Sequence, residues 1–350
     1  MINLKNIKRT REKDNRDFKT GIRADRNEKV EDWSHTIFNK IFKKIKRHEF
    51  TSYYNTNELY QLEKKIAQYL KISKDNFVIN HGGDGVIKEF LLLNNKKNLK
   101  VLINANNYGM YKIYFKALNI KYLEVPYLVD LKTKNLINLN FNYFNENIKK
   151  SNIVFLTYPN VASNFDFKIK DIEYLCKKFS KKLFFIDESY YGFGHPSCIS
   201  IAKKNKNLFV LRSITKTFGL ASARVGFLVS HKDSIKPFKT IETPYPLSLF
   251  SGKCLSFFLE NKKIVNKYNA RVEVGRSFFC KEMEKKKYLI NNGCGLSVLV
   301  YFENFKKLKT TYNRLLKNKI YTKLVKINNY NFIRLTCAPK KIMKKILRDF

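Results

Sequence analysis

The stretch RSITKTFGLASAR, residues 212–224, places one lysine between small hydroxyl residues, a glycine and two arginines. Lysine is normally protonated and is then a poor nucleophile, so a reactive lysine needs surroundings that favour its neutral form. We expect Arg212 and Arg224 to lie near Lys216 and to disfavour its protonation. A neutral lysine can form a Schiff base with a carbonyl compound, and hydroxyls with an arginine can hold a phosphate.

The elements that would position this lysine alternate between short apolar runs and helix-period segments. Strands alternating with helices predict an α/β fold, with a mostly parallel sheet covered on both faces. After long helices from about 245 to 290, the pattern changes near residue 295 to a smaller α+β unit. The expected strands are 76–80, 100–104, 152–157, 182–187 and 207–212, and the expected helices between them are 58–70, 85–94, 108–119 and 172–179.

Polar groups follow the expected strands in turn. In open α/β sheets, ligands bind beyond the carboxyl ends of the strands. Glycines, amides, phenols, an acid and a lysine should therefore meet at one edge. The segments that follow the strands are HGGDG (81–85), ANNYG (105–109), YPN (158–160), Asp187 with Tyr190, and SITK (213–216).

Each of these motifs also has a structural interpretation. HGGDG can be a plain turn, or the N–H groups of residues 82–84 can hold a phosphate at a helix N-terminus. Tyr108 can be a core aromatic, and Asn160 can cap a turn. Asp187 could instead belong to a nucleotide triphosphatase, but the chain has no phosphate-binding loop of that class. A nicotinamide site is disfavoured because no G-x-G-x-x-G follows the first strand.

Composition limits the class of protein. With 44% hydrophobic residues and a length of 350, the chain can bury a sizeable core. The net charge of +40 is spread along the chain without a nucleic-acid-binding signature, so we expect no nucleic-acid partner. The six cysteines show no zinc spacing, so we expect reduced thiols and no metal. We expect neither a signal segment in residues 1–20 nor a membrane span, and therefore a cytoplasmic protein.

Taken together, the motifs resemble the class I and II aminotransferases of pyridoxal phosphate fold type I, and especially the histidinol-phosphate aminotransferase branch. The resemblance runs from about Asp25 to the C-terminus. It implies pyridoxal 5'-phosphate as cofactor, and a large domain with a mostly parallel seven-stranded sheet between helices, plus a smaller α+β domain. It implies catalytic roles for Lys216, which would form the Schiff base, for Asp187 at the pyridinium nitrogen and for Tyr190 at the ring 3-oxygen. The other cofactor contacts that it implies are Gly83, Asp84, Ser213, Thr215 and Arg224 at the phosphate, Tyr108 stacked on the ring, and Asn160 at the 3-oxygen.

The resemblance also implies a homodimer. Tyr54 in YYNTNELYQL (53–62) resembles the tyrosine that crosses the interface to the neighbour's cofactor phosphate. The chain departs from the family pattern at three places. The proline after this tyrosine is Asn55, P-N-N-P-T-G is replaced by PNVAS (159–163), and the N-terminal segment reads RADRNEKVEDW (23–33).

The substrate residues implied by the resemblance lie at both ends of the chain. Arg334 in FIRLT resembles the arginine that binds the substrate carboxylate, and Arg23, Arg26 and Asn27 lie in a segment that resembles the substrate-covering strand. Arginine's planar fork suits two oxygens of a carboxylate or phosphate. Because the departures surround the substrate, we expect a small anionic amine or keto compound with a phosphate or phosphonate group.

We expect three segments: residues 1–45 packing on the small domain and the active site, a large cofactor domain at 46–250, and a small C-terminal domain at 251–350. The expected function is amino-group transfer between an amino acid and that anionic substrate. A decarboxylase of a phosphorylated or phosphonate amino acid would use the same residues, so sequence does not separate the two. A lysine-rich binding protein without catalysis is the third hypothesis.

Overall fold

The computed structural model describes residues 14–133, 136–160, 167–292 and 295–350. The expectation about a signal segment falls mostly on residues 1–13, and the altered PNVAS loop falls partly on residues 161–163, both outside this range. Within it, no helix combines the length and the apolar character that crossing a membrane requires.

The helices are α1 His35–Phe42, α2 Thr56–Leu70, α3 Gly82–Leu93, α4 Met110–Ala117, α5 Phe141–Lys149, α6 Ile169–Lys178, α7 Ile199–Ala202, α8 Lys232–Thr240, α9 Leu249–Glu260, α10 Lys262–Lys285, α11 Phe305–Lys317 and α12 Lys340–Leu347. The strands are β1 Ile22–Arg23, β2 Phe77–His81, β3 Lys100–Asn104, β4 Lys121–Val125, β5 Tyr127–Val129, β6 Ile137–Leu139, β7 Ile153–Thr157, β8 Leu183–Asp187, β9 Leu208–Ser213, β10 Val225–Val229, β11 Ile290–Asn291, β12 Ser297–Phe302, β13 Ile320–Tyr321, β14 Lys323–Ile327 and β15 Tyr330–Thr336.

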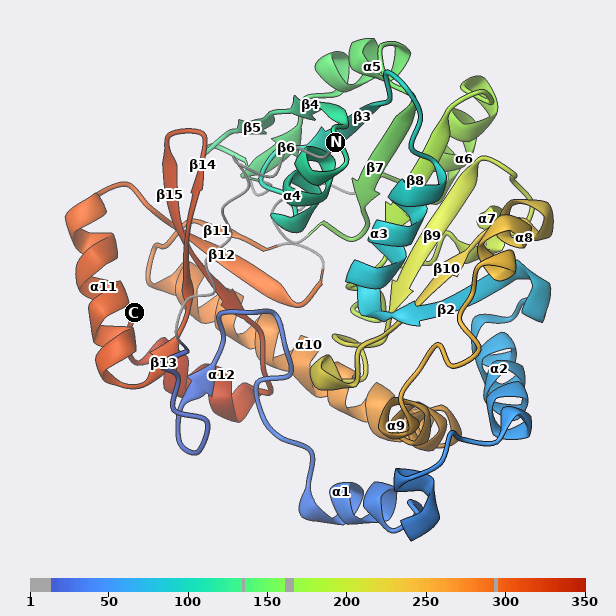
Figure 1. Cartoon of the computed structure of the whole chain (residues 1–350). Coiled ribbons are helices and arrows are strands. Elements are labelled where there is room, and N and C mark those ends of the chain that lie inside the picture. The colour runs from blue at the N-terminus through green and yellow to red at the C-terminus, as the bar shows by residue number, and fades with distance from the viewer. Residues whose placement is uncertain (1–13, 134–135, 161–166, 293–294) are drawn as a thin grey trace.

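A seven-stranded sheet forms the centre of the larger part of the molecule (Figure 1). Its strand order is β2-β10-β9-β8-β7-β3-β4, and only β10 runs antiparallel to its neighbours. The other pairs are parallel, so β3, β7, β8 and β9 all end at one edge. The expected α/β fold with a mostly parallel seven-stranded sheet is confirmed.

Both faces of this sheet are buried, because consecutive apolar residues of a strand point to opposite sides. Phe185 packs with α3, α4 and α8, whereas its neighbours Phe184 and Ile186 pack with α2, α5, α6, α7 and α9 on the other face. This burial explains why the central strands are nearly continuous apolar runs.

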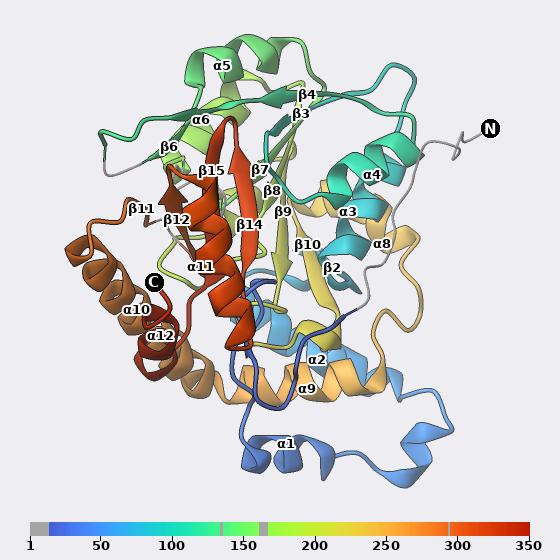
Figure 2. The same cartoon turned by 90° about the vertical axis from the view of Figure 1, so that its left-hand side faces the viewer.

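The smaller part contains the four-stranded antiparallel sheet β11-β12-β15-β14 with α10, α11 and α12 around a separate apolar cluster (Figures 1 and 2). The N-terminal segment joins this part, because β1 pairs in parallel with β13. Helix α10 starts beside α9 and continues along the smaller part, where it packs against α12 and β11 (Figure 2). The expected smaller α+β unit is therefore present.

Two strands of the large sheet were not expected from the sequence. The edge strand β4, KYLEV, contains two charged residues and only one fully buried residue, so its apolar signal is weak. The strand β10, VGFLV, begins immediately after Arg224 and is buried throughout. Helix α3 also begins three residues earlier than expected, within HGGDG, because Gly82 adopts a positive φ of 69° that lets the chain turn directly from β2 into the helix.

Candidate active site

Lys216 lies in the loop after β9, at the edge where the parallel strands end. Its side chain is half-buried, and Nζ donates a hydrogen bond to the Arg26 carbonyl at 3.0 Å. Burial lowers the pKa of Lys216 from 10.5 to about 8; Glu28 opposes this shift, and Arg334 and Arg224 add to it. A much larger fraction of this amine is therefore neutral near pH 7 than for an ordinary lysine.

Arg212 does not contribute to this environment as expected. Its guanidinium lies on the other side of β9, where Nη2 pairs with the Glu188 carboxylate. Strand residues alternate between faces, so Arg212 and Ser213 point in opposite directions. The expectation that Arg212 acts beside Lys216 is wrong.

Asp187 ends β8 and is buried, with 5% of its surface exposed. Its Oδ1 accepts a bond from the Ser189 N–H at 2.9 Å, and its Oδ2 accepts one from the Tyr111 hydroxyl. Burial raises the pKa of Asp187, while Ser189 and Tyr111 oppose that shift. Sequence reasoning missed Tyr111, although its position one helical turn after Tyr108 was a usable signal.

The Asp84 carboxylate connects three side chains at the start of α3. Its Oδ1 accepts bonds from the Tyr108 hydroxyl at 3.0 Å and the Tyr114 hydroxyl at 3.1 Å, and its Oδ2 pairs with Arg224 Nη2 at 2.9 Å. The Arg224 guanidinium covers Gly82, where an added Cβ would lie 3.0 Å from Nη2. Tyr108, Asp84 and Arg224 thus meet as predicted, and Tyr114 joins them.

The predicted hydroxyl residues meet at the end of β9. Ser213 Oγ and Thr215 Oγ1 lie 2.9 Å apart, and both residues are buried. Gly83 lies close to the ends of β8 and β9, since a Cβ on it would lie 3.6 Å from Ser189 Oγ.

Tyr190, which is partly buried, and Asn160, which is buried, lie around the same edge. Asn27 Nδ2 donates to the Tyr190 hydroxyl at 3.2 Å, and burial raises the pKa of Tyr190. Asn160 donates from Nδ2 to the Tyr127 hydroxyl at 2.5 Å. Asn27 is itself fixed by Thr336, whose Oγ1 accepts its backbone N–H at 3.0 Å.

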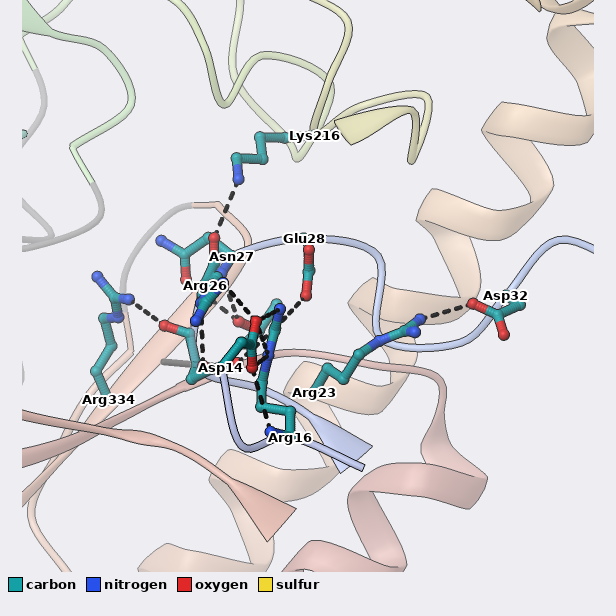
Figure 3. Close-up of polar contacts among 11 residues, drawn as sticks. Asp14, Arg16, Arg23, Arg26, Asn27, Glu28, Asp32, Lys216 and Arg334 are labelled. Carbon is teal, nitrogen blue, oxygen red and sulfur yellow. Dashed lines mark hydrogen bonds and ion pairs between the residues drawn. The ribbon is translucent and has the colours of Figure 1, made fainter. Parts of the chain in front are cut away.

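The N-terminal segment 14–33 covers Lys216 (Figure 3). Within it, the Arg26 guanidinium pairs with Asp14 at 3.0 Å and Arg23 pairs with Asp32 at 2.7 Å. The structure therefore brings the Arg26 carbonyl, and not its guanidinium, to Lys216. Both arginines that we expected to be available for a substrate anion already have carboxylate partners.

Arg334 on β15 is the one predicted substrate arginine that lacks a carboxylate partner within the described ranges. Its Nη2 donates to the Asp25 carbonyl at 2.6 Å, and its Nε is buried without a partner (Figure 3). Burial lowers the pKa of Arg334, whereas Tyr190 and Asp25 oppose that shift. A buried guanidinium with unused donors favours an anionic ligand.

Tyr54 lies apart from these residues. Its ring packs edge-on against Tyr245, with 5.1 Å between ring centroids, beside a cavity of about 590 Å³ between α2 and α9. Across the part of the chain that the structure describes, no hydrogen bond links Tyr54 to the residues around Lys216.

The site residues suit pyridoxal 5'-phosphate. The half-buried lysine with its lowered pKa suits the aldehyde, and the buried acid suits the pyridine nitrogen. The phenol suits the ring oxygen, and the helix N-terminus beside an arginine suits the phosphate. The fold and this arrangement define a pyridoxal phosphate-dependent enzyme of fold type I.

Comparison with known proteins identifies the family. Residues 23–348 match the family described as "Aminotransferase class I and II", so the chain belongs to it. A histidinol-phosphate aminotransferase of Thermotoga sp. (strain RQ2) is 26% identical over 317 residues, covering 89% of this chain and 88% of the relative. The chain is thus a pyridoxal phosphate-dependent aminotransferase, as the resemblance implied.

Solved structures support the fold. The histidinol-phosphate aminotransferase of Sinorhizobium meliloti in complex with pyridoxal-5'-phosphate superposes with a TM-score of 0.80 at 16% identity, covering 93% of this chain and 89% of that one. The L-threonine-O-3-phosphate decarboxylase of Porphyromonas gingivalis superposes with a TM-score of 0.76 at 12% identity, covering 94% and 98%. The fold alone therefore does not separate transamination from decarboxylation.

Proposed function

We propose that this aminotransferase moves an amino group between an amino acid and a small keto or aldehyde compound that carries a phosphate or phosphonate, and that Lys216 holds the cofactor. The observation that carries the proposal is the Lys216 amine, whose pKa is lowered to about 8, at the same sheet edge as Asp187. A two-residue link supports this assignment, because Arg26 accepts from Lys216 while the adjacent Asn27 donates to Tyr190.

In the proposed mechanism the bound cofactor supplies a ring that accepts electrons from the substrate Cα. Lys216 would move a proton to or from Cα, for which a pKa near 8 suits work at neutral pH. Asp187 holds the proton of the ring nitrogen, and Tyr111 keeps the Asp187 carboxylate oriented. Tyr190 and Asn160 bind the ring oxygen through their phenol and amide.

The cofactor phosphate would lie at the start of α3, where the dipole of a twelve-residue helix favours an anion. We assign Ser213, Thr215 and Arg224 to its oxygens, with the backbone N–H groups of Gly83 and Asp84. The Arg224–Asp84 pair is partly exposed, so exchanging the carboxylate for a phosphate costs little. The ring of Tyr108 covers the cofactor from one side.

For the substrate we assign Arg334 to a carboxylate or phosphate, with Asn27 beside it. Lys323 on β14 is the cross-strand partner of Arg334, so the two cations share one face of the small sheet. Two adjacent cations support a substrate with more than one negative charge. We assign Arg26 to the substrate site through its backbone carbonyl, which accepts a hydrogen bond from Lys216.

A donor and acceptor panel tests the proposal. We expect amino-group transfer to keto or aldehyde acceptors with a phosphate or phosphonate, and a loss of at least about tenfold in kcat/KM when that group is removed, as for a lost charged hydrogen bond. Product analysis by mass spectrometry would reveal the decarboxylase alternative as CO2 release without an acceptor. Transfer to plain keto acids only would contradict the anionic substrate.

A lysine variant tests the anion site separately. Lys323→Gln should raise KM for the phosphorylated acceptor while leaving KM for plain amino donors near the wild-type value. Lys326→Gln is the matched control, because position 326 lies on the same strand but faces the opposite side. Equal effects of the two substitutions would exclude a specific role for Lys323.

We further propose a homodimer in the cytoplasm, and three segments. The proposed N-terminal segment is 1–45, and its described residues pack on both parts of the chain: β1 pairs with β13, and Trp33 Nε1 donates to the Phe218 carbonyl at 3.1 Å. We expected the small domain to begin at residue 251. Because residues 255–259 of α9 pack with the large cluster, we propose instead a boundary between α9 and α10.

A further inference from the structure

A buried ion pair lies behind the catalytic edge and has no part in the mechanism above. Glu188 follows Asp187 directly, and Arg212 precedes Ser213 directly. Their side chains are 0% and 3% exposed, and Arg212 Nη2 contacts Glu188 Oε2. The pair therefore joins β8 to β9 at the two positions next to proposed cofactor residues.

The same pair holds the loop that carries Tyr190. Arg212 lies flat over the Tyr191 ring, with 3.5 Å from Cζ to the centroid, and its Nη2 donates to Ser197 Oγ at 2.6 Å. Glu188 accepts bonds from Ser197 Oγ, at 2.9 Å to Oε2, and from the Cys198 N–H. Both ends of the segment 190–198 are thus attached to the ion pair.

The loop that carries Lys216 is attached to the same segment. Thr217 is buried, and its Oγ1 donates to the Tyr191 carbonyl. Gly192 has a φ of 101°, and a Cβ on it would lie 2.5 Å from Thr217 Cγ2. The two loops therefore pack too closely for any side chain at residue 192.

Stability alone does not account for a charged pair here. Burying two charges costs desolvation energy, and well-packed apolar residues often serve as well or better. Moreover, Arg212 Nη2 bonds to both Glu188 and Ser197, while its Nε is buried without a partner. Unlike apolar residues, the ion pair attaches the 190–198 loop to β8 and β9 through directional hydrogen bonds.

We propose that the Glu188–Arg212 pair, together with Thr217, clamps the loop of Tyr190 to the loop of Lys216 and so sets the spacing of their side chains at the cofactor. Glu188, Arg212 and Thr217 are then positioning residues, because none of them touches the reacting atoms. This inference rests on the proposed roles of Lys216 and Tyr190.

Three variants of the cofactor-loaded enzyme test the clamp: Glu188→Gln, the double variant Glu188→Gln/Arg212→Met, and Thr217→Val. The double variant removes both buried charges, so it folds even where one unpaired charge would not. Thr217→Val removes the hydroxyl without introducing a buried charge. Ser230→Ala is the matched control, since Ser230 is buried and its Oγ donates to the Leu208 carbonyl at the opposite end of β9.

Two readouts separate positioning from stability. We expect kcat to fall about 10- to 100-fold with KM for the amino donor within about threefold, as for a misplacement of roughly 1 Å. Without substrate, the pH midpoint of the cofactor's visible absorbance should shift in the double variant and in Thr217→Val, and stay unchanged in Ser230→Ala.

One outcome is decisive against the clamp. Wild-type kcat and an unshifted midpoint in both the double variant and Thr217→Val, with only a lower Tm, would show that the contacts are purely structural. Failure of the proposed function looks different, because the wild-type enzyme itself would then carry no cofactor on Lys216.

Discussion

Among the residues that the structure describes, two lysines have a pKa lowered to about 8, and burial is the main cause for both. Lys29 lies between aromatic rings, with Nζ 3.7 Å from the Tyr268 centroid and 4.4 Å from that of Trp33. Lys216 lies instead at the sheet edge, beside Arg224 and Asp84. A lowered pKa is thus not sufficient for a reactive lysine, which also needs an adjacent site for the carbonyl compound.

The first prediction is that only Lys216 bonds covalently to the cofactor. Borohydride reduction and peptide mapping should label Lys216, and Lys216→Ala should lose the visible absorbance near ~420 nm. The neutral amine is the nucleophile, so the rate at which the apoprotein captures cofactor should rise about tenfold per pH unit up to pH 8 and level off above it. For an ordinary lysine the rate would level off only near pH 10.5.

Lys29→Arg serves as the matched control for this labelling. It keeps a cation over the two aromatic rings, so its absorbance and capture rate should match those of the wild-type protein. A label on Lys29, or on any lysine other than Lys216, would refute the assignment.

At the scale of elements, sequence periodicity predicted the parts of the fold with a strong apolar signal. The runs that form β3, β7, β8 and β9 are buried on both faces, and the order of the motifs after them predicted which residues meet at the edge. Weak signals were missed: β4 carries charges on an exposed edge, and β10 follows a functional segment directly. The residues that follow parallel strands can be placed from the sequence, because these strands end at the same edge of the sheet. The hydrogen-bond partners of their side chains depend on tertiary packing.

Arg212 and Arg26 illustrate that limit. Arg212 was predicted beside Lys216 and Arg26 at the substrate, yet each guanidinium is paired with a carboxylate: Arg212 with Glu188, and Arg26 with Asp14. A spacing pattern does not encode the direction of a long side chain or the carboxylate that neutralises it. The contacts of Tyr111 and Tyr114 join β8 and α3 to α4 and were missed for the same reason.

The N-terminal segment is the element most open to perturbation, because charges hold it over Lys216. Arg16 Nη1 contacts Glu28 Oε1 at 2.5 Å and Asp25 Oδ1 at 3.3 Å, and its Nη2 contacts Asp14 at 3.0 Å (Figure 3). The side chain of Arg16 is only 8% exposed, so water does not screen these contacts fully.

Arg16→Gln should therefore loosen this segment. We expect amide hydrogen exchange in residues 22–33 to accelerate about tenfold, the effect of losing about 1.4 kcal/mol of charged hydrogen bonding. The freed Glu28 carboxylate favours the protonated amine, so the pKa of Lys216 should rise and the cofactor-capture profile should move to higher pH.

Arg348→Gln provides the matched control, since it removes the same charge from an exposed position near the C-terminus. It should change neither hydrogen exchange in residues 22–33 nor the capture profile. Unchanged exchange in Arg16→Gln would show that β1 and the Trp33 contact alone hold the segment.

At the scale of the whole molecule, exposed aromatic side chains gather on the side of the chain that carries Tyr54. Phe50 is 65% exposed and Tyr53 is 79% exposed. Phe250 lies 5.7 Å from Phe50 and 5.8 Å from Phe42 between ring centroids, and Tyr53 stacks on Tyr245 at 4.4 Å. Such a contiguous exposed apolar patch is typical of a protein–protein interface.

The charge of the chain opposes self-association. With a net charge of +40 per subunit, two copies repel each other through solvent, and salt screens that repulsion. A dimer built on the aromatic patch should consequently become tighter as ionic strength rises, which sedimentation at two salt concentrations would measure.

Mixed dimers test whether Tyr54 completes the site of the partner subunit. Subunits with Tyr54→Phe and subunits with Lys216→Ala should each have low activity. In a symmetric hybrid dimer one site combines both mutations and the other is fully native, so an equal mixture should regain about a quarter of the wild-type activity per site. Tyr53→Phe, mixed in the same way, is the control. It should be fully active even without the Lys216→Ala subunits, because Tyr53 is exposed to solvent. If the Tyr54→Phe mixture shows only half the activity of Tyr54→Phe alone, Tyr54 acts within its own subunit. If light scattering finds only monomers at the assay concentration and high salt, a site shared between subunits is excluded.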